Sequence, residues 1–289
     1  MKTINIGKIK GYFPETMGEL TEKQLIELAE CYTGNLTLID AKVLLARKWA
    51  ASLFKFNEKL IEDILTRIRN TDISSQKEML IEKLQSCDHN RYYLSELASW
   101  ITEPMKCDRF IISRIKLRRK WGLYSRTFVS PSVKMGNVQF WEWCKAEMYF
   151  MDYTQNDNRE AFNKFCACLY HPALLNGARG EFKENVIEHN AKYFARLNSV
   201  QVMAIRLNYI AVKGWMAAAF PHVFNGRKSD ADIGTIDMVE LLYRSAEKQR
   251  LDRDLIAKKS LLAELYGLNL AAKDFKEQEA NSGKDSRND

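Results

Sequence analysis

The stretch from residue 137 to residue 224 constrains the fold most, because its apolar and aromatic residues recur at helical spacing with few polar residues among them. Three helices are expected here, the last and longest ending before Pro221, since proline cannot continue a helix. The segment is predicted to pack against itself. The apolar positions of the three helices are Phe140, Cys144, Met148 and Met151; Phe162, Phe165, Cys166 and Leu169; and Val202, Ile205, Tyr209, Val212 and Met216.

The N-terminal region carries clear signals for helix starts. Thr21 and Gln24 have the spacing of a capping box, in which the side chain of each residue bonds the backbone N–H of the other. A second helix is expected over residues 38–53. Asn57 is expected to cap a third helix, and Ser75 to open a fourth with a second capping box. The region is therefore predicted to be helical.

The middle of the chain loses the helical period between residues 110 and 135. Ile115 and Leu117 alternate with basic residues, and residues 127–129 favour strands before Pro131. This pattern predicts either one or two short extended segments or a long loop that links two helical halves.

These patterns predict a mainly α fold: a multi-helix bundle in two halves joined by a basic loop or short β segment, with a C-terminal helical appendage. The expected divisions are a helical region over 1–105, a basic linker over 106–136 and a helical core over 137–224. A polar hinge and amphipathic helices follow over 225–275. Residues 276–289 lack large apolar side chains and are predicted to form a disordered, solvated tail.

The net charge of +7 comes largely from residues 106–120, where basic residues far outnumber the single acid, Asp108. Such a cluster can bind phosphate groups or an acidic protein face, and it can equally be a solvated loop. In the nucleic-acid alternative, Trp121 or Tyr124 would stack on bases. The candidate residues for an anionic partner or nucleic acid are Arg114, Lys116, Arg118, Arg119 and Lys120.

No pattern typical of a reactive centre is found. The glycines are scattered, and no phosphate-binding loop motif occurs. Cys166, Cys168 and His171 suggest a metal site at first, but residues two apart on a helix point in different directions, so packed cysteines are favoured. Glu181 and Lys183 have a spacing seen in nucleases, yet such short patterns arise readily by chance. We therefore expect a protein that is not an enzyme and holds no metal or other cofactor.

Aromatic and leucine side chains are the candidates for protein contacts. Trp141 lies on a different side of its helix from Phe140 and Cys144. It either meets a partner or is sandwiched between two neighbouring helices of its own chain. The candidate residues for a protein partner are Trp141, Leu241, Leu242, Leu262, Leu265 and Tyr266.

The sequence contains no apolar run long enough to cross a membrane and no apolar segment typical of a secretory signal. The six cysteines are expected to be buried and reduced, as in a cytosolic protein. We therefore expect a cytoplasmic location and no membrane partner.

Three segments resemble a family of prophage proteins encoded among tail and other virion-assembly genes, and a fourth resembles the closing helices of proteins encoded next to tape-measure genes. They begin YFPETMGELTEKQL (12–32), VQFWEWCKAEMYF (138–172), AKYFARLNSVQVM (191–224) and DMVELLYRSAEKQ (237–269). The resemblance implies a virion or tail-assembly protein, chaperone-like in action, that contacts another virion protein through helices in the host cytoplasm or in the virion. It carries over no catalytic residues. The basic cluster leaves nucleic-acid binding as the alternative.

Overall fold

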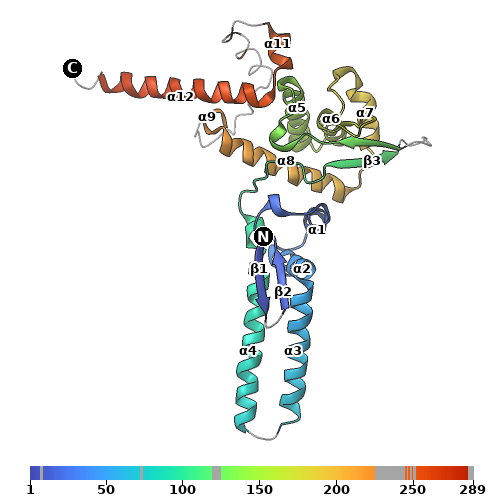
Figure 1. Cartoon of the computed structure of the whole chain (residues 1–289), viewed down its shortest axis with the longest axis vertical. Coiled ribbons are helices and arrows are strands. Elements are labelled where there is room, and N and C mark those ends of the chain that lie inside the picture. The colour runs from blue at the N-terminus through green and yellow to red at the C-terminus, as the bar shows by residue number, and fades with distance from the viewer. Residues whose placement is uncertain are drawn as a thin grey trace. The chain divides into compact units, whose positions relative to one another are not determined.

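The computed structural model describes residues 1–6, 9–71, 74–118, 125–224, 245, 247, 249 and 252–285 of the 289-residue chain. The chain is mostly helical with two small sheets, so the predicted fold class is confirmed (Figure 1). It divides into two compact units. The first comprises Met1–Lys106 with Ser199–Leu207, and the second comprises Cys107–Asn198 with Asn208–Asp289. The five divisions expected from the sequence stay a prediction.

The first unit opens with a β-hairpin that the sequence patterns do not predict. Strands β1 (Lys2–Ile6) and β2 (Ile9–Phe13) pair antiparallel, with Ile4 opposite Gly11. In β1 Ile4 and Ile6 alternate with polar residues, but two apolar positions form too short a run to identify a strand from the sequence. Helices then follow, beginning with η1 (Met17–Glu19), α1 (Glu22–Thr33) and α2 (Leu38–Trp49). The capping box of Thr21 and Gln24 is confirmed at the start of α1.

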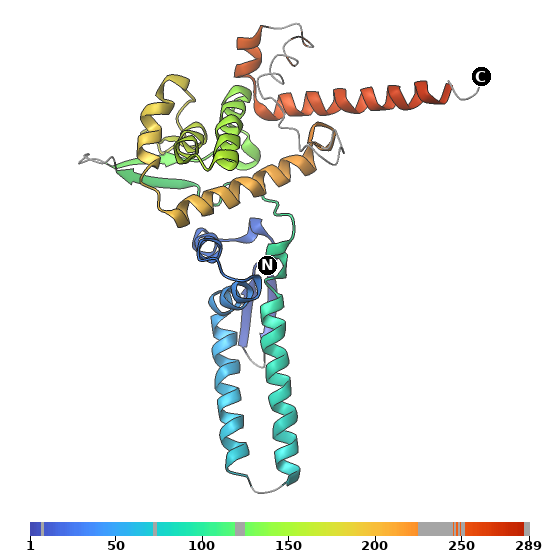
Figure 2. The same ribbon diagram turned by 180° about the vertical axis from the view of Figure 1, so that it is seen from behind.

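Two long helices, α3 (Ala51–Arg69) and α4 (Ser74–Glu96), lie side by side as an antiparallel pair (Figures 1 and 2). The prediction that Asn57 caps a helix is wrong: α3 begins at Ala51, directly after α2 breaks at the non-helical Ala50. Asn57 lies inside α3, buried, and its Nδ2 donates to the backbone oxygen of Cys87 in α4 at 2.9 Å. α4 starts one residue before the expected cap, Ser75, and a short 3-10 helix, η2 (Ser99–Thr102), follows it.

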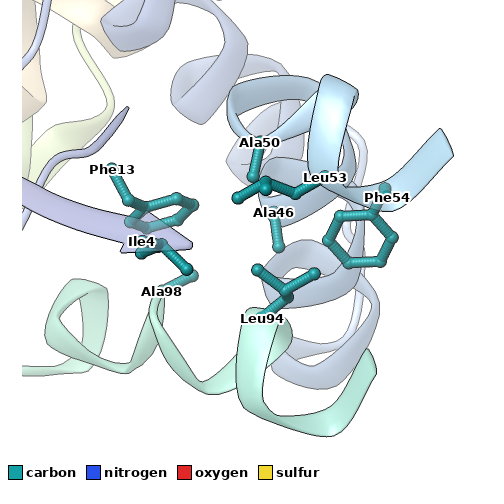
Figure 3. Close-up of a cluster of buried hydrophobic side chains, with 8 residues drawn as sticks. All are labelled: Ile4, Phe13, Ala46, Ala50, Leu53, Phe54, Leu94 and Ala98. Carbon is teal, nitrogen blue, oxygen red and sulfur yellow. The ribbon is translucent and has the colours of Figure 1, made fainter. Parts of the chain in front are cut away.

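The core of the first unit joins the β-hairpin to α2, α3 and α4 (Figure 3). Gly11 is required at this contact, because a Cβ atom there would lie 2.5 Å from Cδ1 of the buried Leu53. The sheet can therefore approach α3 closely. The cluster consists of Ile4, Phe13, Ala46, Ala50, Leu53, Phe54, Leu94 and Ala98.

The second unit contains a three-stranded antiparallel sheet in the order β3-β4-β5. Its strands are β3 (Arg114–Arg118), β4 (Ser125–Val129) and β5 (His171–Pro172). The extended segments predicted around Ile115 and Phe128 are thus confirmed as strands, and these two residues are paired and buried. β3 is an edge strand.

Helices pack beside the sheet, with α5 on α6, α6 on α7, and α7 in contact with β3. Tyr209 of α8 lies at the centre, its ring centroid 4.9 Å from that of Phe150 and 4.7 Å from that of Phe165. The helices predicted over residues 137–224 are therefore present. Their bounds, with those of the short helical turns, are η3 (Val133–Met135), α5 (Phe140–Asn156), α6 (Arg159–Leu169), η4 (Glu184–Val186), α7 (Ile187–Phe194), α8 (Ser199–Ala219) and α9 (Pro221–Phe224).

The C-terminal helices α11 (Arg253–Lys258) and α12 (Leu261–Asp285) are attached to α5. Phe140 N donates to Lys259 O at 2.9 Å, and Leu261 N donates to Val138 O at 3.0 Å. α12 continues through most of the segment expected to be a disordered tail. The predicted hinge at 225–234 lies outside the described residues. None of the helices in the described part is both long and apolar enough to span a bilayer.

Candidate functional site

The basic cluster predicted from the sequence forms one face of β3. Arg114, Lys116 and Arg118 are exposed and alternate with the buried Ile115 and Leu117. Since successive side chains of a strand point to opposite faces, the three basic groups share one face. We call these three residues the basic face. Two further candidates, Arg119 and Lys120, lie outside the described residues, as do Trp121 and Tyr124.

The three residues of the basic face differ in their contacts. Arg114 Nη2 donates to the backbone oxygen of Gly177 at 3.0 Å, so this guanidinium holds the turn that follows β5. Lys116 and Arg118 form no ion pair with any residue that the structure describes. Two unpaired cations side by side on an edge strand can attract an anionic partner, and they also discourage strand-to-strand aggregation.

A second candidate surface is a row of apolar side chains along the outside of α12. Tyr266 is 62% exposed and Leu270 is 43% exposed, one helical turn apart, and the half-buried Leu262 precedes them by a further turn. We call these three residues the outer row. Leu265, also predicted to bind a partner, is fully buried in the second unit and so does not belong to the outer row. The sequence shows the helix but cannot show which side packs inward.

The inner side of α12 also reaches solvent toward the end of the helix. Leu261, Leu268 and Phe275 are spaced by seven residues and therefore share one side. Leu261 is buried and Leu268 is half-buried, whereas Phe275 is 60% exposed. An apolar stripe that packs inside the second unit thus continues into solvent.

Trp141 is held by its own chain. Its Nε1 donates to Glu184 Oε2 at 3.0 Å, and Lys145 Nζ lies 4.8 Å from the centre of its ring. Lys145 and Glu184 are themselves paired at 2.8 Å. The side chain is half-buried, and Glu184 belongs to the short 3-10 helix η4. Leu241 and Leu242 lie outside the described residues.

Buried charges, which sequence reasoning missed, occur at the start of α5. Glu142 is 1% exposed and pairs with the guanidinium of Arg179. His171 Nδ1 lies 2.8 Å from Gly180 O and Nε2 lies 2.7 Å from Cys168 O, while Glu142 Oε1 is 3.5 Å from Nε2. Glu142 and its Arg179 and His171 partners form the Glu142 network. The local sequence signal for Glu142 was its position three residues after Gln139, the spacing of a capping box. The structure contains this capping box at the start of α5.

The electrostatics of the Glu142 network follow from its burial. Desolvation raises the pKa of Glu142 to about 7, although Arg179 opposes the shift. Desolvation and the nearby Arg179 lower the pKa of His171 to about 4. Perturbed groups often mark functional sites. These three side chains are all nearly fully buried, however, so a substrate does not reach them, and their role is to hold the turn after β5.

A second buried acid links α5 to α8. The Tyr209 hydroxyl donates to Glu147 Oε1, and Lys213 Nζ donates to Glu147 Oε2 at 2.7 Å. Burial and the adjacent carboxylate raise the pKa of Tyr209 well above its usual range. Both oxygens of Glu147 are therefore partnered within the unit.

The residues considered for metal chemistry have other roles. Cys166 and Cys168 are fully buried free thiols, and the ring of His171 is used within the Glu142 network. Glu181 lies exposed at the surface. Among the described residues, no three His, Cys, Asp or Glu side chains are placed to hold a metal ion.

Among the described residues, Lys116 and Arg118 on β3 and the apolar residues of α12 are therefore available to bind a partner. The buried networks hold the local geometry of the second unit. Comparison of the chain with family models, with curated proteins and with solved structures gives no match.

Proposed function

We propose that this chain is a non-enzymatic virion-assembly protein that binds another virion or tail protein through α12. The virion setting follows from the sequence resemblance, and the observation that supports binding is the exposure of Tyr266, Leu270 and Phe275 on one ordered helix. Fully burying one large apolar side chain contributes roughly 1.5–3 kcal/mol. Tyr266 and Leu270 share one side of α12 and supply enough free energy for the helix to bind in an apolar groove of a partner. Phe275 lies on the other side of the helix and offers a separate contact.

The attachment of α12 favours this mode of binding. Its first turn is fixed by the backbone hydrogen bond from Leu261 to Val138. Its buried Glu264 accepts from Ser245 Oγ at 2.8 Å and pairs with Lys259 Nζ at 3.3 Å. A helix that is already ordered loses less conformational entropy when it binds. The proposed setting is the host cytoplasm or the virion.

The test is co-purification with the proteins encoded by the neighbouring genes, co-expressed with the full chain. We expect Tyr266→Ser with Leu270→Ser, and separately Phe275→Ser, to abolish co-purification. Leu255→Ser is the matched control, because Leu255 is an exposed leucine on α11. Deleting residues 226–289 is a poorer test, since it also removes the buried Leu265. Undiminished co-purification of both α12 variants contradicts the proposal.

The second candidate function is nucleic-acid binding by the basic face. It is favoured by one observation: Lys116 and Arg118 point outward without an ion pair among the described residues. Binding to phosphates releases counterions, so it should weaken steeply as salt rises. A gel-shift titration with single-stranded and duplex DNA at low and high salt, repeated with Lys116→Glu and Arg118→Glu, tests it. No retention at low salt eliminates this candidate.

A further inference from the structure

The turn over residues 173–179 presents two leucines to solvent. Leu174 is 52% exposed and Leu175 is fully exposed. The turn closes on itself, since Leu174 N donates to Ala178 O and Gly177 N donates to Leu174 O, each at 2.8 Å. Gly177 has φ +77°, a conformation that favours glycine. We call residues 173–179 the leucine turn.

The leucine turn is fastened to the sheet at both ends. Ala173 N donates to Thr127 O in β4 at 2.8 Å, and Gly180 N donates to Pro172 O at 3.0 Å. A Cβ atom on Gly180 would lie 2.8 Å from the same Pro172 oxygen, so only glycine closes the base this way. Arg179 fixes the second end, because its guanidinium donates to Leu169 O at 2.8 Å and pairs with Glu142.

This rigidity makes the exposure of the leucines informative. Loop tips are ordinarily polar and mobile, and exposed apolar side chains on an ordered element mark contact sites. Here the backbone has already lost its freedom on folding, so a partner pays little further entropy to order the turn. Two leucines held in a fixed geometry can enter an apolar pocket as anchors.

The surroundings of the leucine turn are basic. Arg114 reaches it directly through its hydrogen bond to Gly177 O. Thr127, which accepts from the base of the turn, is paired with Lys116 in the neighbouring strand. Arg118 continues the same face, and from Arg114 to Arg118 the row is about 13 Å long at the usual rise of a strand.

We propose that the leucine turn and the basic face together dock a partner protein that has an apolar pocket with an acidic rim. Leu174 and Leu175 fill the pocket, and Lys116 and Arg118 contact the rim. Anchors in a pocket surrounded by complementary charge are the usual arrangement at protein interfaces. The linear row of cations beside a protruding turn fits a shaped protein surface better than a lipid bilayer, which offers no defined pocket. This surface is separate from α12 and does not depend on the function proposed above.

The test is a selection from a phage-displayed library of disulfide-closed peptide loops, long enough to form a pocket, using the full chain as bait. We expect peptides in which Asp and Glu flank large apolar residues. Parallel baits are Leu174→Ser with Leu175→Ser, and Lys116→Glu with Arg118→Glu, and the control bait is Leu38→Ser, an exposed leucine in α2. The first variant should weaken binding of the selected peptides about tenfold or more, as loss of a packed anchor does. The second should weaken it at low salt and less at high salt.

The outcomes are distinct. Peptides without the acidic and apolar pattern, or peptides that bind the leucine variant as well as the unaltered chain, overturn the proposal. A third outcome is that the chain selects no peptides but sediments with phosphatidylcholine–phosphatidylserine vesicles, and does so only when the leucines are present. The partner is then a membrane surface, and the proposal of a protein partner is overturned. Oligonucleotide binding that requires Lys116 but not the leucines also overturns it. The Tyr266→Ser and Leu270→Ser variant should still bind the selected peptides, which separates this result from failure of the α12 proposal.

Discussion

The two units differ in what they bury. In the described part of the chain, the buried charged and titratable polar side chains Glu142, Glu147, His171 and Glu264 all belong to the second unit. Among the described residues of the first unit, Asn57 is the one buried polar side chain; its Nδ2 bonds Cys87 O and its Oδ1 has no partner there. The second unit therefore depends on paired charges for its local geometry, whereas the first depends on apolar packing.

This difference between the units indicates which of them holds a binding surface in a fixed conformation. A buried charge is tolerated only when it is paired and hydrogen-bonded, and breaking the pair is costly. The Glu142 network therefore holds the leucine turn in one conformation. The polar contact described between α3 and α4, from Asn57 to Cys87 O, involves no buried charge and so imposes less constraint. Four predictions test whether the two units differ in this way, in order of decreasing expected effect.

Arg179→Met should lower the free energy of unfolding of the second unit by roughly 3–5 kcal/mol, because it leaves the buried Glu142 without its partner. Urea denaturation measures the loss. The control is Lys164→Met: Lys164 pairs with the exposed Glu160 and Glu188, so its removal should cost less than about 1 kcal/mol. Equal losses in the two variants contradict the claim that charge pairing specifies the second unit.

Glu142→Gln should change how stability depends on pH. The folded pKa of Glu142 is about 7, above the ordinary value of 4.5, so its contribution to stability is complete below about pH 4.5 and is lost as pH rises through 7. The folded pKa of His171 is about 4, below the ordinary 6.5, so its contribution is present above about pH 6.5 and is lost as pH falls through 4. In the unaltered chain, the pH dependence of stability from Glu142 and that from His171 have opposite signs and offset each other.

In the Glu142→Gln variant, only the pH dependence of stability that comes from His171 remains. Its stability relative to the unaltered chain should therefore rise between about pH 4.5 and pH 7, by at most about 1.4 kcal/mol per pH unit. Urea denaturation at several pH values measures the difference, and His171→Asn should shift it in the opposite sense. A difference between Glu142→Gln and the unaltered chain that stays constant with pH contradicts the prediction.

Gly11→Ala tests whether apolar packing stabilises the first unit. The new methyl group would lie 2.5 Å from Cδ1 of Leu53, which belongs to the cluster shown in Figure 3. Such overpacking costs typically about 1–3 kcal/mol. The double variant Gly11→Ala with Leu53→Ala should show coupling between the two sites in a double-mutant cycle, whereas additive losses rule out this contact as the cause.

Asn57→Leu should have the smallest effect, within about 1 kcal/mol, because it removes an amide that is only half satisfied and adds apolar area between α3 and α4. Urea denaturation of the first unit measures it. A loss as large as that of Arg179→Met shows instead that a specific polar contact also fixes the first unit.

Local signals in the sequence predicted much of the fold. The capping box of Thr21 and Gln24 and the alternation around Ile115 depend on residues a few positions apart, and both features are present. β1 was missed because its single buried residue, Ile4, becomes apolar core only through contacts with α2, α3 and α4. Asn57 was mistaken for a cap because the same amide serves equally well as a buried partner for a distant backbone oxygen.

The candidate sites also combine features that the sequence predicted and features that depend on the tertiary structure. The alternation of residues 114–118 predicted that Arg114, Lys116 and Arg118 share a face if the segment is a strand, and the structure contains that strand. Only the tertiary structure decided that Leu265 turns inward while Tyr266 turns outward, and that a short turn carrying two leucines is fastened beside the basic face. Helical and strand periods follow from backbone geometry within a few residues, whereas exposure depends on which distant segments arrive to cover a side chain.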